Sequence, residues 1–202
     1  MTRRLANLNE LSASNRPKYN PNAYGTGIVH LGVGSFHKAH QAYYTDKILE
    51  KSGGDWRIMG VSLRSNDAQN QLRPQNGLYT LLIKGGMGTT SRVIGSIVDV
   101  LSASKNSEPA IQAMVNKNIK IVSLTVTEKA YGLNLSNLGC NINHADIAYD
   151  LKNFHSPRGV LGILTKALAI RKSRKIPPFT VLCCDNLPNN GKLLRSAVID
   201  FA

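Results

Sequence analysis

The chain has 202 residues, of which 42% are hydrophobic and 18% charged, so it is long enough for one ordinary globular core and short for two full domains. Its net charge of +13 raises the question of a nucleic acid or an anionic ligand. The basic residues are dispersed, however, and the aromatic residues, at 6%, are not interleaved with them as stacking platforms would be. We therefore interpret the charge as a solvated basic surface and expect no nucleic-acid partner.

The three cysteines, Cys140, Cys183 and Cys184, have no C-x-x-C spacing and indicate neither a disulfide framework nor a zinc cluster. We assign no metal. The two arginines near the N-terminus are not followed by the continuous apolar stretch of a secretory signal. No run approaches the roughly 18 apolar residues that a membrane span requires. We expect a cytoplasmic protein without a membrane partner.

The first predicted element is a polar arm, residues 1–25, that packs on the domain following it. Residues 28–33 are mostly branched and apolar, which is typical of a strand buried on both faces of a parallel sheet. Gly32 and Gly34 interrupt this run before the helical pattern of residues 36–51. A glycine turn between strand and helix lets the backbone approach a pyrophosphate, so we predict a nucleotide site. The third glycine of G-x-G-x-x-G is missing, which leaves an ordinary strand-to-helix turn as the alternative.

The remaining elements alternate between strands and helices. Residues 56–63 predict a strand, and the group that binds the adenosine ribose is expected at its C-terminal end, where Arg64 stands and Asp67 is the nearest carboxylate. A short helix, two hairpin strands, a helix and a strand are predicted over residues 67–76, 78–84, 92–100, 107–118 and 119–126. A short helix, a long helix, a strand and a final helix follow over residues 147–154, 160–174, 179–184 and 192–202. This order predicts an α/β fold, a Rossmann-like, mostly parallel doubly wound sheet with inserted antiparallel strands.

Thr127 and Glu128 come directly after the strand predicted at residues 119–126. Ligands of open α/β sheets gather at the carboxyl ends of the strands, which makes both residues candidates for the site. A carboxylate that faces a cleft can take part in proton transfer. The alternative for Glu128 is a capping role beside a strand end.

Residues 27–46, GIVHLGVGSFHKAHQAYYTD, resemble the opening of the long-chain polyol dehydrogenases, the family of mannitol 2-dehydrogenase and fructuronate reductase. That family carries G-x-G-x-F-H-[RK]-A-H-Q in place of the third glycine. The resemblance continues in V-x-G-S-I at residues 93–97, T-[IV]-T-E-x-x-Y at residues 125–131 and C-D-N-L-P-x-N-G at residues 184–191. It thus covers nearly the whole chain.

The resemblance implies an NAD site and assigns residues to it. The expected cofactor contacts are Gly32, Val33, Gly34, Ser35, Phe36, His37, Arg64, Asp67, Thr127 and Asn186. Asn186 would also hold the substrate oxygen, and Glu128 would be a carboxylate in the cleft. Asn66 stands where the NAD-preferring mannitol dehydrogenases usually carry a glutamate, so NADP remains open as cofactor.

The implied reaction is hydride transfer between a polyol (D-mannitol, with D-fructose as its ketose) and NAD. A fragment of a fructuronate-type hexuronate reductase and a non-catalytic nucleotide-binding or regulatory module are the alternatives. Members of the family take their catalytic lysine from a second, helical domain that has no counterpart in residues 1–202. We therefore expect an arm at 1–25, a dinucleotide-binding domain at 26–202, no C-terminal helical catalytic domain, and cofactor binding with little or no turnover.

Overall fold

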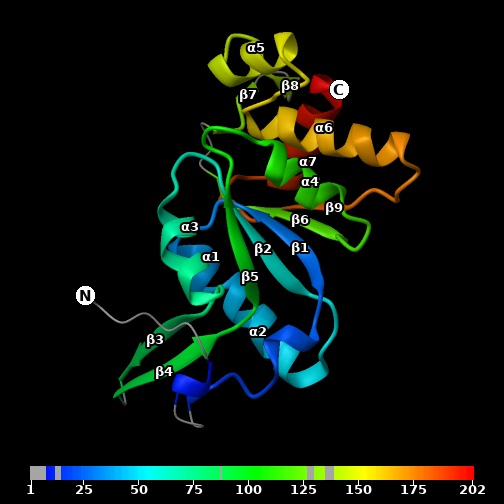
Figure 1. The fold of residues 1–202 in the computed structure, drawn as a ribbon. Coiled ribbons are helices and arrows are strands. Elements are labelled where there is room, and N and C mark those ends of the chain that lie inside the picture. Colours follow the sequence, from blue (N-terminus) through cyan, green and yellow to red (C-terminus); the bar gives the residue numbers. More distant parts are fainter. Residues whose placement is uncertain (1–7, 12–14, 87, 127–129, 135–138) are drawn as a thin grey trace.

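The computed structural model describes residues 8–11, 15–86, 88–126, 130–134 and 139–202 (Figure 1). Its centre is a five-stranded sheet with the order β5-β2-β1-β6-β9, in which all neighbouring strands run parallel. These strands are β1 (Thr26–Leu31), β2 (Arg57–Ser62), β5 (Ile97–Ser102), β6 (Ile121–Leu124) and β9 (Thr180–Cys183). The chain runs outward from β1 through β2 to β5, then returns to β6 on the other side of β1. The point at which this order reverses lies between β1 and β6.

Helices cover both faces of the sheet (Figure 1). On one side lie α1 (Ser35–Ala39), α2 (Gln41–Ser52) and α3 (Asp67–Leu72), and on the other α4 (Glu108–Val115), α6 (Val160–Ser173) and α7 (Asn190–Phe201). Side chains of β1 pack towards both layers of helices, because Val29 and Leu31 belong to one buried cluster and Ile28 to the other. The run of branched residues in β1 therefore reflects burial on two faces, and the predicted fold class is confirmed.

Two short antiparallel pairs and a few short helical elements complete the described part. The hairpin is β3 (Tyr79–Gly85) with β4 (Gly88–Ile94), and the second pair is β7 (Leu133–Asn134) with β8 (Gly139–Cys140). Helix α5 spans Ala145–Lys152, and 3-10 turns span Leu8–Glu10, Pro21–Ala23 and Arg73–Gln75. No helix in these ranges is long and apolar enough to cross a membrane.

The strand predicted over residues 92–100 is wrong as a single element. Its first part is β4 of the hairpin, and its second part is β5 of the parallel sheet. Gly95 and Ser96 separate them: the Gly95 N–H donates to Asp46 Oδ1 at 2.9 Å, and Ser96 Oγ donates to the Ala42 carbonyl at 2.7 Å. Both partners lie on α2, so contacts with that helix divide what the apolar pattern presents as continuous.

The helix predicted over residues 36–51 is also two helices. His40 lies between α1 and α2 with φ −117° and ψ −81°, outside the helical region. Its ring stacks on Phe36, with centroids 4.9 Å apart, and meets Tyr44 edge-on at 5.0 Å. The apolar spacing indicates the helical segment correctly but not this break within it.

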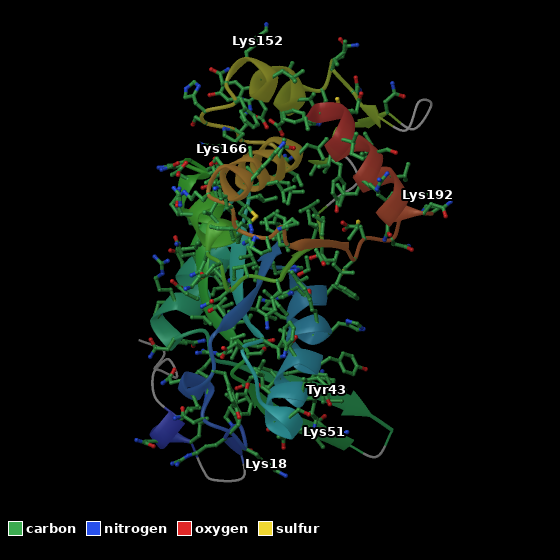
Figure 2. All side chains as sticks on the ribbon, turned by 90° about the vertical axis from the view of Figure 1, so that its right-hand side faces the viewer. Lys18, Tyr43, Lys51, Lys152, Lys166 and Lys192 are labelled. Carbon is green, nitrogen blue, oxygen red and sulfur yellow. The ribbon has the colours of Figure 1, made fainter. Side chains whose placement is uncertain are left out.

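Arg171 belongs to the densest basic stretch of the sequence, yet its side chain is only 2% exposed. Its guanidinium donates to the carbonyl oxygens of Met114, Asn116, Ile119 and Pro177 at 2.7–3.1 Å. The first three carbonyls lie at or just after the C-terminal end of α4, and that of Pro177 follows α6. Arg171 therefore joins α6 to α4 and is not part of a solvated basic surface. Of the lysines labelled in Figure 2, Lys152 and Lys166 lie at one end of the molecule and Lys18 and Lys51 at the other.

Candidate functional site

Two glycines follow β1, and they differ in what requires them. Gly32 has φ +101°, and a Cβ there would lie 2.2 Å from the Thr125 carbonyl oxygen, so the fold itself demands glycine. Gly34 has φ −111°, and the nearest atom to an added Cβ would be the Gly32 oxygen at 3.9 Å. A Cβ at Gly34 would thus come no closer to the described atoms of the protein than ordinary van der Waals contact. The missing side chain therefore leaves room for a bound ligand.

A cavity of about 270 Å³ opens beside this turn. It lies at the carboxyl ends of β1, β2 and β6, where the strand order reverses and where open α/β sheets bind ligands. Its walls are Gly32, Val33, Gly34, Ser62, Leu63, Arg64, Ser65, Thr125, Val126 and Ala130. Gly60 of β2 makes space for this wall, because a Cβ there would lie 2.7 Å from Val33 Cγ2.

A second cavity of about 290 Å³ shares Leu63, Arg64 and Ala130 with the first and adds a more polar wall that includes Ser104 and Arg158. Near it, the Asn66 side-chain oxygen accepts hydrogen bonds from Ser102 Oγ at 2.6 Å and Ser104 Oγ at 3.0 Å. With its oxygen engaged, the Asn66 amide is left to act as a donor. The turn after β2 thus carries a guanidinium at Arg64 and an amide donor at Asn66.

The loop after β6 is tied to the turn after β9. Asp185 accepts hydrogen bonds from the Tyr131 hydroxyl and, at 3.3 Å, from the Val126 N–H. Asn190 holds the turn from the other side, because its amide donates to the Asp185 carbonyl at 2.8 Å and to the Cys183 carbonyl at 3.3 Å. Burial, followed by the hydrogen bond to Asp185, raises the pKa of Tyr131 above its usual value, so the phenol stays protonated and donates.

Comparison with known proteins identifies a family for this fold and this site. Residues 26–202 match the family described as "Mannitol dehydrogenase Rossmann domain". The chain belongs to this family. The resemblance drawn from the glycine turn and the later motifs is thereby confirmed.

Individual relatives are similar over nearly the whole chain. A mannitol 2-dehydrogenase of Pyrenophora tritici-repentis is 42% identical over 199 residues, which cover 97% of this chain and 35% of that enzyme. The Pseudomonas fluorescens mannitol 2-dehydrogenase, solved as a ternary complex with NAD and D-mannitol, is 42% identical with a TM-score of 0.90, over 98% of this chain and 41% of that one. A D-sorbitol dehydrogenase, solved in substrate-free form, is 35% identical with a TM-score of 0.87, over 95% of this chain and 41% of its own. The chain thus spans less than half the length of these relatives.

The structure brings part of the predicted site together. Gly32, Val33, Gly34 and Arg64 line one cavity, and Ser35 stands exposed at the start of α1. Asp67 is exposed at the start of α3, and Asn186 is exposed in the turn after β9. Thr127 and Glu128 lie outside the described residues. All of these assignments stay predictions about binding.

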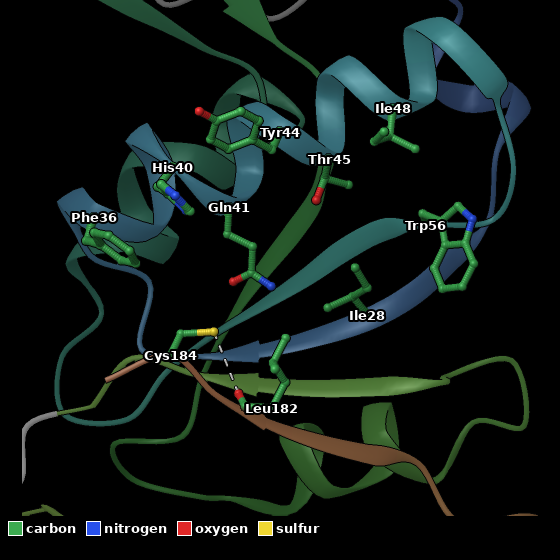
Figure 3. A pocket seen from close by; sticks show the side chains of 10 residues that line it. All are labelled: Ile28, Phe36, His40, Gln41, Tyr44, Thr45, Ile48, Trp56, Leu182 and Cys184. Atoms are coloured by element: carbon green, nitrogen blue, oxygen red, sulfur yellow. Dashed lines mark hydrogen bonds between the residues drawn. The ribbon is translucent and has the colours of Figure 1, made fainter. Parts of the chain in front are cut away.

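Phe36 and His37 point elsewhere. His37 is fully buried, and burial lowers its pKa to about 4. Phe36, 54% exposed, lines another cavity of about 470 Å³, whose walls come from the helical segment of α1 and α2 and from β1 and β9 (Figure 3). That cavity is almost wholly apolar and contains neither glycine of the turn. We assign no ligand to it.

Sequence reasoning missed six wall residues, Ser62, Leu63, Ser65, Thr125, Val126 and Ala130. They follow or end strands, as the predicted residues do, so their position along the chain was the available signal. It also missed His30, a polar residue in an apolar strand, which is fully buried beneath the turn. Within the described ranges, no group of three or more His, Cys, Asp or Glu side chains could hold a metal ion.

Proposed function

We propose that this chain binds NAD at the glycine turn and serves hydride transfer between NAD and a polyol, with D-mannitol and D-fructose as the expected pair. The observation that carries the cofactor site is Gly34. It lines the cavity at the reversal of strand order, and no packing contact with the residues that the structure describes requires glycine there. Close approach of a pyrophosphate to the backbone gives this glycine a reason.

Residues on either side of the cavity would divide the cofactor between them. The backbone N–H groups of the turn would face the pyrophosphate, with no side chain at Gly34 to obstruct it. Arg64 and Asp67, after β2, would flank the adenosine ribose. Asn186, and Thr127 and Glu128 by resemblance, would lie towards the nicotinamide end. NAD, when bound, supplies the hydride acceptor, while the chain supplies position and electrostatics.

The polyol substrate is proposed from the relatives. The Pseudomonas enzyme was solved as a complex with NAD and D-mannitol, and the other solved relative is a D-sorbitol dehydrogenase. Asn186 would donate its amide to the oxygen that becomes alkoxide-like as hydride leaves the neighbouring carbon. We assign the proton-accepting base to no residue of 1–202, because the family's lysine belongs to its second domain. We therefore expect the chain alone to bind cofactor with little turnover.

The test of the cofactor site is a fluorescence titration of the 202-residue chain with NADH and NADPH, followed on the reduced nicotinamide. Gly34→Ala should fold normally and weaken NADH binding at least about tenfold, because its methyl group would occupy the space needed by the pyrophosphate. Gly86→Ala is the matched control: it too would meet open space, but in the β3–β4 turn. Equal binding by both variants would remove the glycine turn from the site.

An activity assay distinguishes the proposed function from its alternatives, a fructuronate-type reductase fragment and a regulatory module. NADH formation from D-mannitol at enzymatic rates by this chain would contradict the expected lack of turnover. In the longer relatives the same assay, run with mannitol and with a hexuronate, distinguishes the polyol from the fructuronate-type proposal. A regulatory module would bind NADH without any turnover even when the helical domain of a relative is fused to it.

A further inference from the structure

A chain of buried polar side chains lies directly beneath the glycine turn. His30 and His37 are both fully buried, and their rings stack with centroids 3.6 Å apart. His30 Nδ1 is 2.8 Å from Ser123 Oγ, and its Nε2 is 3.1 Å from the Gly32 oxygen and 2.9 Å from Thr125 Oγ1. Burying polar groups in a core costs free energy of folding, so we expect this series of hydrogen-bonded side chains to have a function.

One assignment of donors and acceptors satisfies all the hydrogen bonds in this series of side chains. The Gly32 carbonyl only accepts, so His30 Nε2 carries the proton and its Nδ1 accepts from the Ser123 hydroxyl. Ser123 Oγ in turn accepts from the Gln41 amide at 2.8 Å. Gln41, which points from α2 towards the sheet (Figure 3), accepts at its oxygen from His37 Nδ1 at 3.3 Å. Every step is directed towards the Gly32 carbonyl.

The Gly32 carbonyl is the last acceptor in this series and accepts hydrogen bonds from two donors. Thr125 Oγ1 donates to it at 2.8 Å, beside the bond from His30. The described residues contain no cis peptide bond, so the carbonyl of Gly32 and the N–H of Val33 point in opposite directions across one peptide plane. Holding the carbonyl towards buried His30 therefore turns the Val33 N–H away from it. Val33 lines the cavity, and its N–H has no acceptor among the residues that the structure describes.

We propose that His30 is a positioning residue, which holds the Gly32–Val33 peptide so that the Val33 N–H points into the cavity as a donor for a phosphate oxygen. The proposal rests on the proposed function, since it concerns the same site. Without the two donors beneath it, this peptide can turn over and present its carbonyl oxygen to the anion. His30 would touch neither cofactor nor substrate; it acts through the peptide.

The experiment compares two probes, ADP and adenosine, on the wild-type chain and on His30→Phe, by calorimetry. The phenyl ring keeps an aromatic side chain stacked on His37 but removes the hydrogen bonds to Ser123, Gly32 and Thr125. ADP should bind about tenfold more weakly, the scale of one lost hydrogen bond to a charged group, whereas adenosine, which has no phosphate, should bind equally well. His30→Gln, whose amide can replace the Nε2 donor, should restore most of the ADP affinity.

The outcomes are distinct. Equal weakening of ADP and adenosine would mean a general structural role, and unchanged ADP binding would mean no role; either overturns the proposal while the cofactor site stands. Failure of the folded wild-type chain to bind ADP and NADH would overturn the proposed function itself. If His30→Phe does not fold, Thr125→Val against Thr125→Ser asks the same question, because only valine removes the second donor to Gly32. The valine variant should then show the selective loss of ADP affinity, and parallel affinities in the two variants would contradict the proposal.

Discussion

The Tyr131 hydroxyl donates a hydrogen bond to the Asp185 carboxylate, and this contact joins two loops that follow neighbouring strands of the sheet. Tyr131 is only 1% exposed, and Asp185 directly precedes Asn186. The same carboxylate accepts from the Val126 N–H, next to the cavity wall formed by Thr125. One side chain thus fixes the loop after β6 relative to the turn that carries Asn186.

Tyr131→Phe tests this hydrogen bond between the two loops. Removal of the hydroxyl leaves the Asp185 carboxylate with one partner fewer, and we expect the free energy of unfolding to fall by about 1–2 kcal/mol. Urea denaturation measures it, and NADH affinity should fall with it because the cavity wall loosens. Tyr44→Phe is the matched control, since the Tyr44 side chain is 57% exposed. Equal stability of the two variants would show that the contact contributes nothing.

Acid should destabilise the protein through the buried histidines. Burial lowers the pKa of His37 from 6.5 to about 4, and burial together with His37 lowers that of His30 as well. The unfolded chain therefore binds more protons, so this contribution is fully present above pH 6.5 and is lost as the pH falls towards 4. For His37 alone, moving from neutral pH to about pH 5 should cost about 2 kcal/mol. Urea denaturation of wild type and His37→Phe at both pH values checks this; parallel losses would exclude His37 as the cause.

The parallel core was predictable because its signal is local: β1 is a buried strand of branched residues, and Gly32 and Gly34 follow it directly. The division of residues 92–100 was not, because Gly95 and Ser96 are held by Asp46 and Ala42, about fifty positions away in sequence. Nothing in a local apolar pattern encodes such partners. Arg171 is a similar case, since its carbonyl partners on α4 exist only in the folded chain.

The candidate site shows the same limit at closer range. Motif and position along strands led to Gly32, Gly34 and Arg64, which do line one cavity. They could not indicate that Phe36 lines a different cavity or that His37 turns inward, because the break at His40 and the stacking on His30 decide both orientations. A motif specifies which residues are present, whereas the packing of α1 against β1 specifies where each one points.

Asn66→Asp should shift the preference between the two cofactors. In the wild-type chain the exposed Asn66 accepts at its oxygen from Ser102 and Ser104, and its amide nitrogen can only donate. A carboxylate there would repel the 2′-phosphate of NADPH and leave NADH, which lacks it, almost unaffected. At an exposed site we expect about a fivefold rise in the Kd for NADPH relative to NADH, from about 1 kcal/mol of repulsion. Paired titrations measure the ratio, and an unchanged ratio would place the ribose elsewhere.

Asp46→Asn should be one of the more destabilising substitutions outside the candidate site. Asp46 is fully buried on α2 and accepts from Arg92 at 2.6 Å, from the Gly95 N–H and from Tyr19, which precedes β1. An amide cannot accept from all three, so Arg92 loses its buried carboxylate partner and keeps only Glu50, at 2.6 Å. We expect about 2 kcal/mol less stability, the scale of a hydrogen bond between charged groups. Asp99→Asn is the control: its pair with Arg73 is half exposed and should be worth less than about 1 kcal/mol. If urea denaturation gives the two variants equal losses, the Asp46 cluster does not hold the segment before β1 and the hairpin onto α2.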